Sequence, residues 1–169
     1  LNKNKALTFF RRNEKETKEH NMIVDMERND LSKICKTGSV KIDKLKKVEE
    51  YRDLFHYVTT IKGVIKNKMS NHDIISSLMP GGSVIGCPKI STIQLLNRKE
   101  KFDRNIYTGS FGIIHSNGDM RFNIMIRTLL NFKNDIELSV ASGVILGSTA
   151  KKEYNENYIK AKSLLDLFN

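Results

Sequence analysis

The stretch IYTGSFGIIHSNGDMRFNIMIRTLLNFKNDIELSVASGVIL, residues 106–146, predicts the fold class of this chain. It contains runs that indicate strands at 106–115, 120–131 and 135–146, separated by Asn117-Gly118 and Lys133-Asn134. An Asn-Gly pair between apolar runs is a strong signal for a tight hairpin turn. We therefore expect antiparallel strands that follow one another along the chain.

Helices are expected before and after this β-rich stretch. Apolar residues recur at helical spacing over residues 9–35, where Gly38 provides a stop, and over residues 151–168. Shorter helices are expected over residues 71–78 and after Pro88. The first of these begins with Asn71 as its expected capping residue.

Two further segments indicate strands. Residues 39–43 alternate in polarity, and residues 54–65 are rich in β-branched and aromatic side chains. Together with the flanking helices, these segments predict an α+β fold, in which helices pack on an antiparallel β-sheet.

The composition narrows the class of protein. With 169 residues, 39% of them hydrophobic and 28% charged, the chain is long enough for one domain with a core. It contains no run of about 18 apolar residues, so we expect no membrane span. The net charge is +10, and the lysines that contribute to it are spread along the sequence and do not alternate with aromatic residues. We therefore expect no nucleic-acid partner, although a basic surface also attracts a small dianionic substrate.

The two cysteines are far apart in the sequence. Cys35 and Cys87 form no C-x-x-C pair and indicate neither a zinc site nor a disulfide framework. Unpaired thiols are typical of a reducing compartment, and we expect a cytoplasmic protein.

Acidic pairs of one form, Glu16-x-x-Glu19 and Glu153-x-x-Glu156, lie in the first and last predicted helices. Residues three apart share a helix face. One possibility is that all of these glutamates are solvated. The other is that the two faces meet, in which case the repulsion between the carboxylates requires a hard cation such as Mg²⁺.

Residues 80–89, PGGSVIGCPK, predict a loop with three glycines between two prolines. Glycine allows the backbone of such a loop to approach a ligand closely. Cys87 lies in this loop without a histidine nearby in the sequence, so we do not expect it to be a nucleophile.

In this order and spacing, these segments resemble the C-terminal part of the chorismate-utilising enzymes. That family includes anthranilate synthase component I, aminodeoxychorismate synthase component I, isochorismate synthase and salicylate synthase. The resemblance covers nearly the whole chain and rests on residues 19–30, 55–56, 80–89, 107–109, 124–128, 143–148 and 153–160. It implies the larger chorismate-binding fold, of which residues 1–169 are expected to be the C-terminal portion.

The resemblance implies Mg²⁺ as the cofactor. Glu19 and Glu156 correspond to the metal ligands, while Glu16 and Glu153 are expected to hold water or to orient the ligands. The metal would then bridge to the ring carboxylate of chorismate and act as a Lewis acid.

The resemblance also implies which residues bind chorismate, a dianion. Lys160 is expected to pair with a substrate carboxylate. Arg127 offers a planar fork for the enolpyruvyl carboxylate, and Tyr107 can add a hydroxyl donor. The backbone at Gly143 and the loop residue Ser83 complete the expected substrate-binding set.

His56 corresponds to the family's catalytic histidine, which lies beside the C4 hydroxyl of the ring and could assist its departure. A histidine in a strand is otherwise usually held only by hydrogen bonds. A second polar group, Asp25, Arg28, Asn29 and Asp30, is expected to form a structural hydrogen-bond network that ends the first helix.

Within the family, the Gly-Gly-Ser run of residues 81–83 favours aminodeoxychorismate synthase component I. The implied reaction is amination of chorismate to 4-amino-4-deoxychorismate in the folate (para-aminobenzoate) pathway. The ammonia would come from a glutamine amidotransferase subunit or domain. Anthranilate synthase component I is the alternative enzyme. A second alternative, from a different class of function, is a remnant that acts as a binding module without catalysis.

The sequence departs from the family pattern in two places. The family's Pro-Ile-x-Gly-Thr segment, whose variable residue is a lysine in aminodeoxychorismate synthases, does not occur in the chain. Because the chain starts at Leu1, we expect a fragment with little or no turnover alone, with exposed strand edges and apolar surface. Val140-Ala141-Ser142-Gly143 stands where the family prefers a glycine-rich turn.

Overall fold

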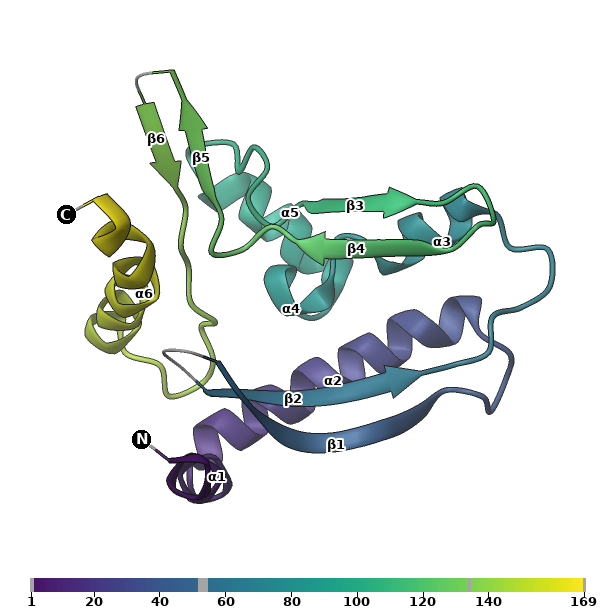
Figure 1. Ribbon diagram of the computed structural model, residues 1–169, viewed down its shortest axis with the longest axis horizontal. Helices are drawn as coiled ribbons and strands as arrows, with labels where there is room; N and C mark the ends of the chain where they lie inside the picture. The colour runs from purple at the N-terminus through teal and green to yellow at the C-terminus, as the bar shows by residue number, and fades with distance from the viewer. Residues whose placement is uncertain (1, 52–54, 134, 169) are drawn as a thin grey trace. The chain divides into compact units, whose positions relative to one another are not determined.

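The computed structural model describes residues 2–51, 55–133 and 135–168 and divides into two compact units, residues 1–93 and 94–169. Each unit combines helices with antiparallel strand pairs (Figure 1), so the predicted α+β class is confirmed. The described strands form three separate antiparallel pairs, β1-β2, β3-β4 and β5-β6.

The first predicted helix is divided into two. It forms α1 (Lys3–Arg12) and α2 (Glu14–Ile34), so it starts earlier than expected and breaks at Asn13. Asn13 adopts an extended backbone, ends α1 through its N–H, and accepts the N–H of Glu16 on its side-chain oxygen at 3.3 Å. One asparagine therefore caps both helices, which the apolar periodicity does not reveal.

Strands β1 (Lys41–Glu50) and β2 (Phe55–Lys62) form a long hairpin that lies along α2 (Figure 1). The first strand extends well beyond the predicted 39–43. The lysines of this strand do not follow the alternating pattern by which a strand is predicted from sequence. The pairing register of β1 with β2 shifts on both sides of Lys44. Leu54, where the second strand was predicted to start, lies outside the described residues.

The core of the first unit lies between its helices and this hairpin. Val24 and Ile34 of α2 are buried, as is Val48 of β1. Between α1 and β2, the rings of Phe10 and Tyr57 stack in parallel with their centroids 4.8 Å apart. Burial of these apolar groups supplies the main driving force for the packing.

The short helices follow. Helix α3 (Asn71–Leu78) has the predicted bounds, but Ser70 rather than Asn71 is its cap, in a capping box with Asp73. The glycine loop contains one helical turn, α4 (Gly82–Ile85). As predicted, α5 (Lys89–Lys99) begins directly after Pro88.

The β-rich stretch of the second unit contains two hairpins. Strands β3 (Ser110–Ile114) and β4 (Met120–Ile124) are joined by the predicted Asn117-Gly118 turn, where Gly118 has φ +90°. Strands β5 (Leu129–Phe132) and β6 (Asp135–Leu138) form the second pair. Asn134, part of the other predicted turn, lies outside the described residues.

Three strand predictions are partly wrong. The run 106–115 is a strand only over Ser110–Ile114, because residues 105–108 form turns. The run 120–131 is interrupted between β4 and β5, where Arg127 has φ +48°. The run 135–146 is a strand only as far as Leu138. The irregular segment that follows leads to α6 (Ala150–Leu165) and a short 3₁₀ helix, η1 (Asp166–Phe168), at the position predicted for the last helix.

In the part of the chain that the structure describes, no helix is both long and apolar enough to cross a lipid bilayer. Cys35 is buried, Cys87 is exposed, and both are free thiols, as expected.

Candidate functional site

Tyr107 and Arg127 lie on neighbouring segments at the base of the β3-β4 hairpin. The Thr108 N–H donates to the Met125 carbonyl, and the Met125 N–H donates to the Gly109 carbonyl, each at 2.9 Å. These bonds extend the hairpin past its last strand pair. The structure therefore brings together the segments of two residues that were expected to bind the substrate.

Arg104 fixes the segment that carries Tyr107. Its guanidinium binds Glu100 through two hydrogen bonds of 2.8 and 2.5 Å and donates to the Thr108 hydroxyl at 3.2 Å. It also lies 6.0 Å from the centre of the Tyr107 ring. A guanidinium with several fixed partners restrains its surroundings. This restraint holds Thr108, which is buried and has φ +65°.

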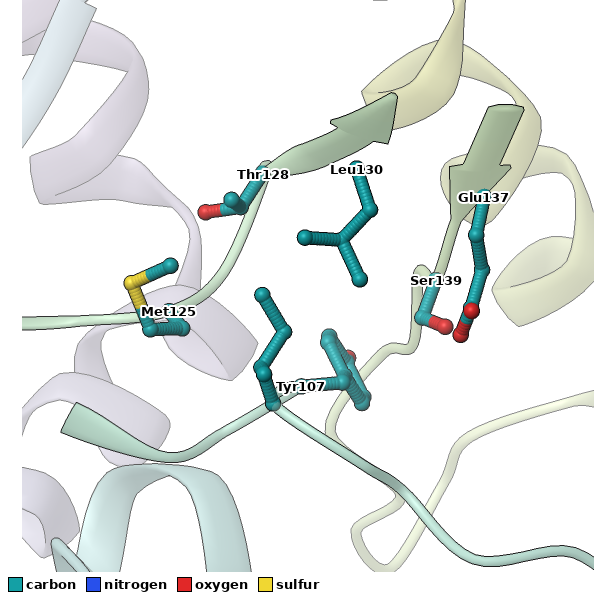
Figure 2. A pocket seen from close by; sticks show the side chains of 7 residues that line it. Tyr107, Met125, Thr128, Leu130, Glu137 and Ser139 are labelled. Atoms are coloured by element: carbon teal, nitrogen blue, oxygen red, sulfur yellow. The ribbon is translucent and has the colours of Figure 1, made fainter. Parts of the chain in front are cut away.

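Burial raises the pKa of the Tyr107 hydroxyl, and Arg104 opposes this shift. Figure 2 shows a small cavity beside the Tyr107 side chain. The cavity has a volume of about 10 Å³, which suits a single water molecule. It is lined by Ile106, Tyr107, Met125, Thr128, Leu130, Glu137 and Ser139. A cavity of this size does not hold a ring substrate.

The face of α6 carries a second group of predicted site residues. Glu153 is only 7% exposed, and the Lys160 ammonium lies 2.7 Å from the Glu156 carboxylate. The same ammonium donates to the Ala141 carbonyl at 3.3 Å, and the Ser142 hydroxyl donates to the Glu153 carbonyl at 3.5 Å. The Lys160 side chain and the Glu153 backbone are thus attached to the segment that leads to Gly143, and Glu156 pairs with Lys160 beside it.

The departure from the family pattern at residues 140–143 has a structural role. The Ser142 hydroxyl, which a glycine would lack, attaches the segment to α6, whereas the Ala141 contact uses a backbone carbonyl that any residue has. Neither contact needs a glycine.

This face of α6 also carries an amide oxygen of the kind that a hard cation accepts. Among the described residues, the Asn157 side-chain oxygen has no hydrogen-bond partner although it is buried. Asn157 lies one turn after Glu153, on the same face of α6. Carboxylate and amide oxygens are ligands that Mg²⁺ accepts.

The other predicted metal ligands and the predicted catalytic histidine belong to the first unit. Glu16 and Glu19 are half-buried and lie three residues apart in the first two turns of α2. His56 lies on β2 opposite Glu49, and its ring is 5.0 Å from that of Tyr51. On the same strand, the Thr59 hydroxyl lies 2.7 Å from the Nε2 atom of His20.

Loop 80–89 is attached to α2. Lys89 forms an ion pair with Asp30 of α2, and the Ser83 backbone lies beside the Glu27 carboxylate, where it opposes the rise in the pKa of that group. Sequence reasoning placed Asp30 in a network that ends the first helix. Its bond to Lys33 agrees with that interpretation, but its bond to Lys89, far along the chain, was missed.

The two acidic pairs belong to different units, so their predicted meeting around one cation stays a prediction. Over residues 2–51, 55–133 and 135–168, no group of three or more His, Cys, Asp and Glu side chains could hold a metal ion.

A family model for chorismate binding enzymes matches residues 2–166. The chain belongs to this family. The match covers both units and therefore includes every predicted site residue.

Two relatives whose names state different reactions have equal sequence identity to this chain. It is 38% identical to an anthranilate synthase component I-like protein of Synechocystis over 90% of the chain and 32% of the relative. It is also 38% identical to aminodeoxychorismate synthase component 1 of Bacillus subtilis, over 88% of the chain and 32% of that protein. The chain therefore spans about a third of the length of these relatives.

The fold agrees with this membership. The structure of anthranilate synthase component I from Streptococcus pneumoniae is similar with a TM-score of 0.81 and 36% sequence identity. That likeness covers 95% of this chain and 37% of the other. The predicted anthranilate synthase-like fold is confirmed.

Proposed function

We propose that this chain binds chorismate together with Mg²⁺ as part of an enzyme that aminates chorismate to 4-amino-4-deoxychorismate. The observation that carries the proposal is the α6 face, where Glu153 and Lys160 contact residues 141–142 and Glu156 pairs with Lys160. Carboxylates suit a divalent cation, and an adjacent ammonium suits the carboxylate of a dianion.

Glu19 and Glu156 would hold Mg²⁺, with Glu16 and Glu153 beside them. The bound metal would supply a Lewis acid for the ring carboxylate. The buried oxygen of Asn157 supports this donor set, because a buried acceptor without a donor costs free energy unless a ligand satisfies it.

The remaining site residues act on the substrate. Arg127 and Tyr107 would bind the enolpyruvyl carboxylate, and Lys160, the Gly143 backbone and Ser83 would orient the rest of the molecule. Their adjacent segments support the pairing of Arg127 with Tyr107. Fixed donors favour one orientation of a planar dianion over others.

His56 would serve at the C4 hydroxyl as a proton donor, so that the leaving group departs as water. Ammonia would come from a glutamine amidotransferase partner. The Gly-Gly-Ser run of residues 81–83 favours this reaction. The Synechocystis relative instead favours anthranilate formation as the second candidate, because its identity to the chain is equal.

Chorismate-dependent thermal stabilisation tests the binding proposal. With Mg²⁺ present, chorismate at a hundredfold excess over Kd should stabilise the chain by about 2.7 kcal/mol. Lys160→Met should remove this gain, because it removes the cation on the α6 face. The matched control is Lys162→Met on the same helix, whose ammonium pairs with Asp166.

Stabilisation that is equal in Lys160→Met and wild type contradicts the proposed site. A chain without any response to chorismate contradicts binding itself and favours a remnant without this function. Product analysis of the enzyme that contains the chain then separates the two reactions, since anthranilate formation releases pyruvate and amination at C4 does not.

A further inference from the structure

We propose that Asp30 and Lys89 are positioning residues, whose ion pair holds the glycine loop 80–89 at a fixed place on helix α2. The proposal rests on the proposed function for its catalytic meaning, because α2 carries two expected metal ligands and the loop carries Ser83. Its structural part can be tested without any ligand.

Asp30 is a buried carboxylate in the last turns of α2. The residue is 2% exposed and binds Lys33 at 2.7 Å as well as Lys89. A buried charge is costly unless it is paired and hydrogen-bonded. Both carboxylate oxygens of Asp30 accept an ammonium hydrogen bond, so the residue meets this requirement.

The two lysines differ in what they connect. Lys33 lies three residues from Asp30 on the same helix, and its side chain is 49% exposed. Lys89 is 59 residues away in the chain, and its side chain is 22% exposed. A pair within one helix stabilises only that helix, whereas the Lys89 pair joins the end of the loop to α2.

The start of the loop contacts α2 one turn earlier. A Cβ atom at Gly82 would lie 3.2 Å from the Met26 side chain, so glycine allows the backbone to approach the helix. The backbone of the next residue, Ser83, lies beside the Glu27 carboxylate and favours its charged form. Residues 26, 27 and 30 lie on one face of the helix.

Lys89 is also the counter-charge for Glu27. Burial and repulsion from Asp30 raise the pKa of Glu27, and Lys89 opposes this shift. One ammonium therefore offsets two carboxylates that would otherwise repel each other at the loop contact. Removing it should weaken both attachments of the loop.

The consequence for the proposed site is geometric. Glu19 and Glu27 are eight residues apart on one continuous helix, which corresponds to about 12 Å along its axis. A loop fixed at residues 26–30 therefore keeps Ser83 at a set distance from the acidic pair. Substrate-binding groups need such restraint, since small displacements reduce rates strongly.

Amide hydrogen exchange of Ser83 measures the attachment directly. In Lys89→Met we expect Ser83 to exchange about tenfold faster than in wild type, as its protected state opens more often. Lys89→Arg keeps the charge and should restore protection. Lys33→Met is the matched control, since it removes the other partner of Asp30 and should leave Ser83 exchange within about twofold.

Chorismate affinity in the presence of Mg²⁺ is the second readout. It should fall about tenfold in Lys89→Met, recover in Lys89→Arg, and stay near the wild-type value in Lys33→Met. Denaturation by urea accompanies each measurement, so that a loss of global stability is distinguished from a local release of the loop.

Unchanged Ser83 exchange in Lys89→Met overturns the proposal, as does an equal increase in Lys33→Met. If the loop is released but chorismate affinity is unchanged, the ion pair is structural only and the positioning role is wrong. A wild-type chain that does not bind chorismate rejects the proposed function, and the exchange data still decide whether the ion pair holds the loop.

Discussion

At the scale of single residues, Arg127 has an unfavourable backbone for its type. Its φ of +48° lies in the left-handed region, where arginine is less stable than glycine or asparagine. Such strain is often retained where a side chain has a function, because the surrounding structure enforces it. The expected role of Arg127 in binding a carboxylate fits this pattern.

Replacing Arg127 should therefore separate stability from binding. Asparagine tolerates positive φ, so Arg127→Asn should increase the free energy of unfolding by roughly 1 kcal/mol while chorismate affinity falls at least about tenfold. Urea denaturation and calorimetric titration measure the two effects. The control is Lys68→Asn, since Lys68 has φ +65° and no expected role in binding. A loss of affinity in both variants would contradict this account.

Glu27 allows a prediction about pH. Burial, followed by repulsion from Asp30, raises the pKa of Glu27 above its ordinary value of 4.5. The native state therefore keeps this proton to a higher pH than the unfolded state does. Stability from this group is complete below the unfolded pKa and decreases as the pH rises through the folded pKa.

Glu27→Gln should thus be more stable than wild type at about pH 7 and lose the advantage at about pH 4. The gain should stay below about 1 kcal/mol, because the group is only half-buried and solvent screens its charge. Urea denaturation at both pH values measures it. Glu14→Gln, which alters an exposed ion pair with Lys18, should change stability little at either pH. An advantage for Glu27→Gln that grows on acidification would refute the prediction.

At the scale of elements, the β3-β4 hairpin depends on Gly112. A Cβ atom there would lie 2.2 Å from the Arg121 carbonyl oxygen and 2.5 Å from the Phe122 ring. Because the first of these is backbone, the contact is relieved only if the strands separate.

Gly112→Ala should therefore destabilise the chain by roughly 1–3 kcal/mol, the range for overpacking. Thermal unfolding measures this loss, and amide exchange across β3 and β4 locates it. Ser110→Ala on the same strand is the control, because Ser110 is exposed. Equal effects of the two changes would show that crowding at Gly112 is not the cause.

The elements also show what the sequence could predict. The Asn117-Gly118 turn and α3 were found from local signals, because turn and helix preferences act over a few residues. The break at Arg127 was missed because its side chain gives no sign of a positive φ. The strand at 41–50 was underestimated because its lysines suggest a solvated loop.

In the candidate site, too, some contacts could be predicted from the sequence and others could not. The spacing of Glu153, Glu156 and Lys160 on one helix face was predictable, since helical geometry fixes it. Glu100 and Arg104 lie after the end of α5, so helical spacing did not predict their ion pair. The ion pair of Asp30 with Lys89 depends on tertiary packing and has no comparable local signal.

At the scale of the whole chain, apolar side chains remain on the surface. On β3, Phe111 is 72% and Ile113 is 54% exposed, two residues apart on one face. An exposed apolar strand is a site for self-association. This agrees with the expectation that the chain exposes apolar surface.

Phe111→Lys should reduce self-association, because a charge on an exposed strand opposes pairing with another copy. Light scattering over a range of protein concentrations measures the change. Phe9→Lys is the control, since Phe9 is 57% exposed but lies on helix α1. If the two variants behave alike, general surface hydrophobicity rather than the strand causes association.

The contact between Lys160 and Glu156 has a consequence for how two ligands would influence each other. In the structure the Lys160 ammonium and the Glu156 carboxylate neutralise each other, so neither charge is fully available to bind a ligand. If a divalent ion binds Glu156 as proposed, the Lys160 ammonium would be released for an anion, and an anion that binds Lys160 would release the carboxylate for a cation. Linkage requires the two enhancements to be equal, so metal and dianion should bind with reciprocal positive cooperativity.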